Sequence, residues 1–576
     1  MLMKRAVIIS VIVAALLLLL GLLGLRTGED VPLPTQDSTA PTETAPTTAP
    51  AETTVPPTEA PTTEPTTAPT EPELVFAPQH TVSSDPANWN TTWDIMAQGE
   101  IVESYTRSDP IFFEDDNYFA LPGIATFRGS NHRADASYGT AKITEAKLES
   151  IWSMSVGWLS EIEWIGCGWT GQPLVVQWDE ETKANMNLYP DKKAKEGLVE
   201  VIYAKMDGLV HFFDMEDGTP TRDPVYVGMV FKGAGALDPR GYPLLYLGAG
   251  LKEKDDYQRI YIVNLLDGTI AYRQSGVDAF AHRGWFAFDS SPLVDAETDT
   301  LIWPGESGVL YTMKLNTQYD KAAGTISVAP DTVVKCRYTN DYYRQGRYLG
   351  YEGSAVVVDH YLYAGDNAGM LHCIDLNTME LVWAQDILDD LNSTPVFDWG
   401  EDGRGYLYIA PSLDYSGNGR YNTLPICKLD AQTGEILWTY ETPCYTEDGV
   451  SGGTLSSPLL GRPGTDLEDL VIYSVGRSPS AWTGTVVALN KHTGQVVWEM
   501  QTKNYMWSSP IGVYDENGKG YIFQGDASGN CYLLDGATGQ VLDMVALHQT
   551  IEASPVVFGN RIIMGTRLGI VLFSVR

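Results

Sequence analysis

Carboxylate, amide and aromatic side chains occur just ahead of several short apolar runs. Side chains of these kinds could bind a small molecule or a metal ion. The candidate ligand-binding residues are Trp169, Arg283, Trp285, Asp289, Glu352, Asn392, Trp507 and Glu552. If they converge, aromatic faces, carboxylates and one arginine would form a small-molecule pocket. Asp289, Glu352 and Asn392 offer the oxygen ligands that calcium prefers. The alternative is that each residue only satisfies a strand end or packs against a neighbour.

The sequence carries no established catalytic motif. It has no G-x-S-x-G, P-loop or H-E-x-x-H pattern, and its eight histidines form no ligand spacing. The six cysteines are far apart, with no C-x-x-C pair. We therefore expect buried free thiols, with one disulfide as the alternative. No catalytic residue is assigned.

Whether the candidate residues meet depends on a repeating unit of four strands. Residues 362–383 read as three short β runs joined by two tight turns, and similar stretches return at 426–438, 486–498 and 531–543. Each unit opens with a small or prolyl pair ahead of a β run, at intervals of 40 to 63 residues. The eight openings begin at Gln172, Gly235, Ser291, Ser354, Thr394, Ser457, Ser509 and Ser554. This spacing predicts an all-β, eight-bladed β-propeller, in which residues ahead of the inner strands ring one mouth of the channel.

The two ends of the repeat region complement each other. After Pro555 the chain supplies only three β runs, and the missing outer strand is available at residues 148–152. Pairing these ends would close the ring and remove its exposed edges.

A turn of the form Asp-x-x-Thr-Gly followed by tryptophan recurs in the best repeats. Ala488 through Trp498 fits the pattern A-x-D-x-x-T-G-x-x-x-W with asparagine for aspartate, and Lys428 through Trp438 lacks only the alanine. We expect Trp152, Trp383, Trp438 and Trp498 to pack flat on neighbouring blades. These motifs resemble the quinoprotein-type (PQQ-like) propeller family with its tryptophan-docking repeats, most clearly over residues 355–545.

The resemblance leaves the function open between two classes. The family's dehydrogenases bind pyrroloquinoline quinone (PQQ) and calcium over the central channel, whereas relatives such as the outer-membrane assembly lipoprotein carry no cofactor. The adjacent cysteine pair of its alcohol dehydrogenases is missing here, and no family catalytic residue can be carried over. Residues 127–133 resemble the family's entry segment and are expected to anchor the lead-in.

The N-terminal part predicts a membrane-anchored protein. Residues 1–5 form a basic cytoplasmic stub, and residues 6–25 are an apolar run of about 20 residues, long enough to span a bilayer. A cleaved signal peptide is the alternative. The Thr/Pro-rich stretch at 26–75 predicts a disordered stalk. An irregular lead-in at 76–146, expected to pack on the outside, and the propeller at 147–576 complete the chain.

The net charge of −36 argues against nucleic acid as a partner. We expect a single-pass protein of the cell membrane with a monomeric extracellular head. Its predicted role is a non-catalytic binding or scaffold module for an envelope protein, peptide or glycan, without a cofactor. The alternatives are a PQQ- and calcium-dependent oxidoreductase, with Asp289, Glu352 and Asn392 as metal ligands, and a glycan-processing enzyme that uses paired carboxylates such as Asp289 and Glu352.

Overall fold

The structure is a computed structural model that describes residues 75–114, 118–155, 165–167, 171–250, 258–416, 420–446 and 451–576. The chain divides into two compact units, Met1–Glu71 and Pro72–Arg576, and all described residues belong to the second. The predicted stub, membrane segment and stalk thus lie outside the described residues, apart from Val75. Within those residues, no helix has the length and apolar character needed to cross a bilayer.

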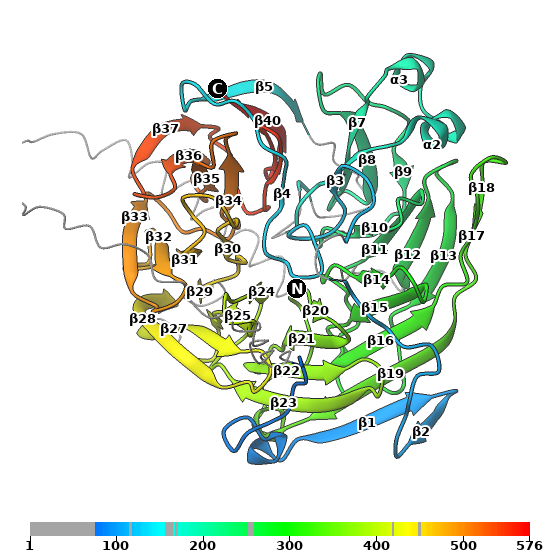
Figure 1. Cartoon of the computed structure of the whole chain (residues 1–576), viewed down its shortest axis with the longest axis vertical. Coiled ribbons are helices and arrows are strands. Elements are labelled where there is room, and N and C mark those ends of the chain that lie inside the picture. Colours follow the sequence, from blue (N-terminus) through cyan, green and yellow to red (C-terminus); the bar gives the residue numbers. More distant parts are fainter. Residues whose placement is uncertain are drawn as a thin grey trace, which may run out of the picture. The chain divides into compact units, whose positions relative to one another are not determined.

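Eight sheets form eight blades around a common centre (Figure 1), as the repeat spacing predicts. We number them in chain order by their inner strand. Blades 1 to 4 consist of β6 (Leu174–Gln177), β7 (Val199–Ala204), β8 (Leu209–Asp214) and β9 (Val225–Tyr226); β10 (Ala236–Leu237), β11 (Leu244–Gly248), β12 (Gln258–Asn264) and β13 (Ile270–Ser275); β14 (Leu293–Asp295), β15 (Thr300–Pro304), β16 (Val309–Lys314) and β19 (Asp331–Thr339); and β20 (Val356–Val358), β21 (Tyr361–Gly365), β22 (Met370–Asp375) and β23 (Glu380–Asp386).

Blades 5 to 8 follow the same order from the centre outward. They consist of β24 (Val396–Trp399), β25 (Gly405–Ile409), β27 (Arg420–Asp430) and β28 (Ile436–Thr446); β30 (Leu459–Leu460), β31 (Leu470–Gly476), β32 (Gly484–Asn490) and β33 (Val496–Thr502); β34 (Ile511–Tyr514), β35 (Gly520–Gly525), β36 (Asn530–Asp535) and β37 (Val541–Ala546); and β38 (Val556–Phe558), β39 (Arg561–Gly565), β40 (Gly569–Val575) and β5 (Leu148–Ser155).

The remaining elements are short additions to this ring. They are β1 (Thr92–Ala97), β2 (Glu100–Val102), β3 (Gly123–Ile124), β4 (Ser137–Tyr138), β17 (Gln318–Asp320), β18 (Thr325–Ser327), β26 (Ser412–Leu413), β29 (Gly452–Gly453), η1 (Pro86–Trp89), α2 (Glu180–Asn185), α3 (Pro190–Ala194) and α4 (Asp341–Arg344).

Burial follows the position of a strand in its blade. The middle strands β31 and β35 are buried at every residue, because each lies between two neighbouring blades. The outer strand β33 instead alternates between exposed and buried residues. This difference explains why the middle strands read as continuous apolar runs and the outer strands as alternating ones.

The ring closes between the two ends of the propeller, as predicted. β5 pairs antiparallel with β40, with Trp152 opposite Leu572. The last blade therefore takes its outer strand from residues that precede the first blade, which ties the two ends together.

The small residues that open the repeats link successive blades. The amide of Thr394 donates to Ser457 Oγ at 3.1 Å, the amide of Ser457 to Ser509 Oγ at 3.0 Å, and the amide of Ser509 to Ser554 Oγ at 3.2 Å. Each hydroxyl satisfies a buried amide of the preceding blade, so serine or threonine has a structural reason at these positions.

The lead-in departs from the prediction. β1 and β2 do pack on the outside, where β1 pairs with β19 and extends blade 3. Residues 123–138, however, run through the centre of the ring (Figure 1), where β3 pairs with β6 and β4 with β38. We call this stretch the hub. The sequence prediction of an external lead-in was wrong here, because buried polar residues looked like those of a surface loop.

Two buried arginines fix the hub to four blades. Arg128 donates to the carbonyls of Pro510 and Pro458 at 2.9 and 2.7 Å. Arg133 donates to those of Ala355 and Ser291 at 2.8 and 3.0 Å. The guanidinium groups thereby satisfy carbonyls at the start of inner strands, which have no other strand beside them in the channel.

Candidate metal centre at the channel mouth

One position of the repeat recurs at the mouth of the channel. Four residues ahead of the inner strand stand Lys232, Asp289, Glu352, Asn392, Leu455, Trp507 and Glu552, in blades 2 to 8 in that order. We call this the mouth position. Asp289, Glu352, Asn392 and Leu455 line one cavity with the hub residue Phe127, so the hub closes the channel below them.

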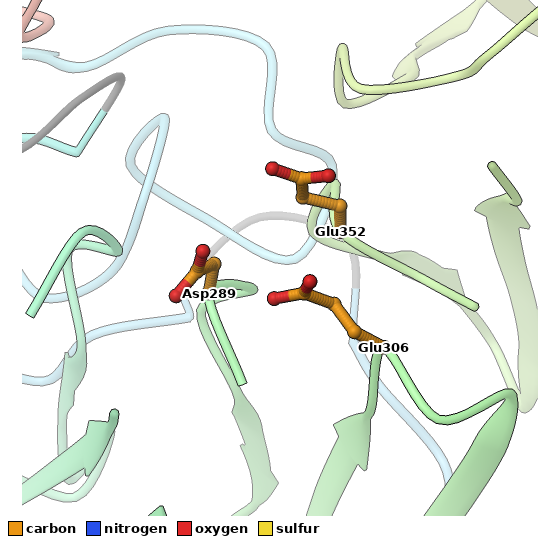
Figure 2. A group of neighbouring side chains, drawn as sticks. All are labelled: Asp289, Glu306 and Glu352. Atoms are coloured by element: carbon orange, nitrogen blue, oxygen red, sulfur yellow. The ribbon is translucent and has the colours of Figure 1, made fainter. Parts of the chain in front are cut away.

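Three carboxylates of blades 3 and 4 meet at this mouth. Asp289 and Glu352 occupy mouth positions, and Glu306 comes from the turn between β15 and β16 (Figure 2). One oxygen of each lies within 4.8 Å of the others. We call these three residues the acidic triad. Two oxygens on opposite sides of a calcium ion, each about 2.4 Å from it, would be about this far apart.

The triad carries unsatisfied oxygens in a dry environment. The side chain of Asp289 is 6% exposed and the residue Glu306 is 2% exposed. In the described part of the chain, Asp289 Oδ1 and Glu306 Oε1 accept no hydrogen bond. Such buried acceptors are costly unless a proton or a cation satisfies them.

Burial and mutual repulsion favour protons on the triad. Burial, and then the charges of Asp289 and Glu352, raise the pKa of Glu306 well above its usual value. Burial is also the main cause that raises the pKa of Glu352. Without a metal, the triad therefore holds a proton to higher pH than isolated carboxyl groups do.

Lys232 partly neutralises the cluster. Its Nζ lies 2.9 Å from Asp289 Oδ2. Burial lowers the pKa of Lys232, but Asp289, Glu306 and Glu352 outweigh this effect and hold it above its usual value. A metal ion at the triad would compete with this ammonium group for Asp289.

A polar network extends the triad into blade 5. Asn367 Nδ2 donates to Asp390 Oδ1 at 2.9 Å and lies 3.3 Å from Glu352 Oε2 and 3.4 Å from Asn392 Oδ1. Asn392 Nδ2 donates to Asp390 Oδ2 at 3.1 Å. Burial, and then the charge of Glu352, raise the pKa of Asp390 well above its usual value.

An aromatic and cationic rim borders the triad. Trp285 Nε1 donates to Glu306 Oε2 at 2.6 Å, although the residue is 39% exposed. The Arg283 guanidinium lies 5.7 Å from the centre of the Trp285 ring and 4.7 Å from that of Tyr348. Arg283 also donates to Asn367 Oδ1 at 2.9 Å. An exposed indole is thus bonded directly to a triad carboxylate.

The other predicted site residues lie away from the triad or outside the described residues. Trp169 is outside them. Trp507 is buried beside Tyr505, with ring centres 5.1 Å apart. Glu552 forms an ion pair with Arg567 at 2.5 Å in its own blade.

The four predicted docking tryptophans each reach the next blade. Trp383, Trp438 and Trp498 donate to the carbonyls of Ala431, Lys491 and Gly536 at 3.1, 3.2 and 2.9 Å. Trp152 donates to the Met215 carbonyl at 3.0 Å. All six cysteines are buried and unpaired.

Sequence reasoning missed Glu306, Lys232 and Asn367. Lys232 shares the mouth position with Asp289 and Glu352, so the repeat register could have found it. Glu306 and Asn367 lie in the turns between the second and third strands of blades 3 and 4, which open on the same face as the mouth positions. Residues 366–369 are a hairpin turn, as predicted, whose Asp366 accepts from the amides of Ala368 and Met370.

Comparison with known proteins agrees with this architecture. A family model described as outer membrane protein assembly factor BamB matches residues 292–465 and 483–572. The structure of quinohemoprotein alcohol dehydrogenase from Comamonas testosteroni is similar with a TM-score of 0.54 at 13% identity, covering 79% of this chain and 80% of that one. A europium-containing methanol dehydrogenase gives 0.52 at 14%, covering 77% and 90%. Over the matched residues the chain thus belongs to the PQQ-like propeller family, and the similar structures extend this likeness to the eight-bladed fold.

The curated relatives match only part of the chain. The dehydrogenase subunit of a quinone-dependent alcohol dehydrogenase from Gluconacetobacter polyoxogenes is 24% identical over 213 residues. This match covers 37% of the chain and 28% of that relative. The comparisons therefore join the propeller to both a scaffold and a dehydrogenase branch of the family.

The described mouth fits an ion better than a quinone. The cavity beside Asp289, Glu352 and Asn392 has a volume of about 20 Å³. This volume suffices for one water molecule or ion, whereas organic ligands occupy pockets of about 300 Å³ or more. This cavity thus suits a cation and is too small for a three-ring cofactor.

Proposed function

We propose that the propeller is a non-catalytic binding module whose channel mouth holds a divalent cation. The observation that carries this proposal is the acidic triad, in which the buried Glu306 and the partly buried Asp289 and Glu352 bring oxygens within 4.8 Å of one another. Asp289 Oδ1 and Glu306 Oε1 accept no hydrogen bond in the described part of the chain. A cation of charge +2 would satisfy them and relieve their repulsion.

Calcium suits this site best. The available ligands are carboxylate oxygens of the triad and amide oxygens of the neighbouring asparagines, and hard cations prefer oxygen ligands. Calcium accepts six to eight ligands in irregular geometry, so ligands from separate blades are acceptable. Magnesium demands a near-ideal octahedron, and zinc prefers nitrogen and sulfur.

The rim supplies a surface for a ligand of the module. Trp285 and Tyr348 are 39% and 58% exposed, and the Arg283 guanidinium lies near both rings. Because Trp285 is bonded to Glu306, an ion at the triad would also fix the rim. We place the head outside the membrane, anchored by residues 6–25, with an envelope protein, peptide or glycan as its partner.

A quinone-dependent oxidoreductase is the second candidate. It is favoured by the similarity to quinone-dependent alcohol dehydrogenases. The small cavity and the ion pair between Lys232 and Asp289 speak against it, as does the absence of an adjacent cysteine pair. The same cavity volume disfavours glycan processing, because no sugar ring fits between Asp289 and Glu352.

Thermal unfolding separates these candidates. The purified full-length chain is heated with calcium, with PQQ, with both and with neither. A ligand at about 100 times its dissociation constant adds about 2.7 kcal/mol to the free energy of unfolding. The binding module predicts a higher melting temperature with calcium and no further rise with PQQ. A rise that requires PQQ would contradict it and make the oxidoreductase the better account.

A further inference from the structure

Lys428 stands at a position where other blades carry an apolar residue. It lies ten residues ahead of the docking Trp438 and opposite it in the sheet. The equivalent residues of blades 4, 6 and 7 are Cys373, Ala488 and Leu533, and each is fully buried. Lys428 is itself only 5% exposed. The fold therefore accepts an apolar residue at this position, so the packing of the blade does not require a lysine.

Within the described part of the chain, the amine of Lys428 has no counterion at bonding distance. Its Nζ lies 3.6 Å from the centre of the Tyr406 ring and 5.5 Å from that of Tyr408. Among the described residues, no carboxylate pairs with this amine and no hydrogen bond fixes it. The neighbouring Lys491, by contrast, lies 2.9 Å from Asp398. The Tyr406 face attracts the charged form through a cation–π contact, but it cannot replace the hydrogen bonds that an ammonium group makes in water.

The amine lines a hollow between blades 5 and 6. The hollow has a volume of about 390 Å³, the size of a small-ligand pocket. Tyr406, Leu437 and Trp438 give it apolar and aromatic walls. Glu401 and Asp402 are exposed at its rim and would repel a ligand that carries a negative charge.

Burial leaves the amine partly neutral. Burial lowers the pKa of Lys428 to about 8, an effect that Asp398 and Asp402 oppose and Lys491 supports. At pH 7 about one molecule in ten then carries a neutral amine, against fewer than one in a thousand for an ordinary lysine. His492, also in the wall of the hollow, pairs with Asp469 at 3.0 Å.

We propose that Lys428 is a nucleophilic amine that binds a small, uncharged aromatic aldehyde as an imine. The nitrogen lone pair attacks the carbonyl carbon, a proton moves from nitrogen to oxygen, and water leaves as the C=N bond forms. The step needs no oxidant or reductant. Desolvation is the usual way in which proteins activate lysine for this chemistry. The site lies at the blade junction and is independent of the acidic triad.

Reductive trapping tests this inference on the full-length chain. The protein is treated with limiting benzaldehyde and sodium cyanoborohydride between pH 6 and 9, and peptide mapping measures the label at each lysine. At pH 7 we expect Lys428 to react at least tenfold faster than Lys491 and the exposed Lys142. Its rate should level off above a pH of about 8, and the variant Lys428→Ala should lose this fast phase.

Two results would overturn the inference. Lys428 could react no faster than Lys142, which would show that the hollow excludes the aldehyde. Alternatively, its rate could keep rising with pH beyond 9, in parallel with that of Lys142, which would show an ordinary ammonium group. Ala488 stands at the equivalent position of blade 6, so Lys428→Ala is expected to fold and to serve as the control.

Discussion

Glu306 is the residue on which the chemistry of the channel mouth depends most. It is 2% exposed, lies close to two other carboxylates and, among the described residues, accepts a hydrogen bond on only one oxygen, from Trp285. In low dielectric such a group remains protonated or binds a cation. Its ionisation therefore links the stability of the fold to the occupancy of the site.

The pH dependence of stability should reveal this carboxyl. The pKa of Glu306 is raised well above its ordinary value of 4.5, chiefly by burial, so the folded chain retains a proton that the unfolded chain loses. Without calcium, the free energy of unfolding should fall as pH rises above about 4.5, by up to about 1.4 kcal/mol per pH unit and per group, until the raised pKa is passed. Urea unfolding between pH 4.5 and 8 measures the slope.

The variant Glu306→Gln provides the control for this slope. It keeps the shape of the side chain but cannot ionise, so its stability should fall less steeply over the same range. Saturating calcium should flatten the slope of the natural protein. Equal slopes for both proteins without calcium would show that Glu306 keeps an ordinary pKa.

At this scale, the sequence predicts half of the site. Asp289, Glu352 and Asn392 are predicted from their position ahead of an inner strand, because this position lies at the channel mouth in every blade. Glu306 lies in Pro-Gly-Glu-Ser-Gly, which reads as an ordinary hairpin turn. Its side chain reaches the mouth because of the position of blade 3 in the ring. A local sequence pattern does not contain this position.

At the scale of the strands, neighbouring blades are joined where the docking tryptophan of one blade packs on a turn glycine of the next. A Cβ atom on Gly539 would lie 2.4 Å from Trp498 Cε3. The backbone of Gly539 also has a φ of +71°, which disfavours other residues. Glycine is thus required twice, by its turn and by the indole that covers it.

Gly539→Ala should therefore cost more than the turn alone explains. Gly464 offers the matched control, because its φ is +73° and nothing lies within 4 Å of its missing Cβ. We expect Gly464→Ala to lower the free energy of unfolding by about 1 kcal/mol. Gly539→Ala should lower it by at least about 2 kcal/mol, because Trp498 must also move. Chemical denaturation measures both, and equal losses would argue against docking.

The sequence predicts strand positions well where the repeat is regular. The three β runs expected within residues 362–383 are β21, β22 and β23, which span Tyr361–Gly365, Met370–Asp375 and Glu380–Asp386. β1 was missed as an addition to blade 3. Its partner β19 lies some 240 residues later in the chain, and pairing at such separation leaves no local pattern.

At the scale of the whole molecule, the hub supplies hydrogen-bond donors to inner-strand carbonyls that face the channel. Arg128 and Arg133 are fully buried and connect inner strands of blades 3, 4, 6 and 7. Burial lowers the pKa of Arg128 to about 10, so the side chain remains charged at neutral pH. Arg128 and Arg133 each donate to two of these four carbonyls, which would otherwise lack a hydrogen-bond donor among the described residues.

Arg128→Met should destabilise the whole propeller. The carbonyls of Pro458 and Pro510 lose their donor, and we expect a loss of about 2 to 5 kcal/mol, seen as a lower melting temperature. Arg404→Met is the control, because Arg404 is 56% exposed on its side chain and lies 3.8 Å from Asp430. That change should cost less than about 0.5 kcal/mol. Similar melting temperatures for the two variants would exclude a supporting role for the hub.

The closed ring was predictable from the sequence and its filled centre was not. Residues 148–152 have the spacing of an outer strand and complete blade 8, so the count of strands alone closes the ring. The hub has two buried arginines and an irregular backbone. Its composition resembles a surface loop, and only the carbonyls of distant blades make it stable inside.

Calcium titration of the full-length chain by calorimetry tests the central claim, that the acidic triad is a cation site, most directly. We expect one site per chain, with at least tenfold weaker binding in Glu306→Gln and unchanged binding in Glu552→Gln. Lys232→Met should bind more tightly, because the ammonium group no longer competes for Asp289. No binding to the natural protein, or the same affinity in Glu306→Gln, would contradict the assignment of the triad as a cation site.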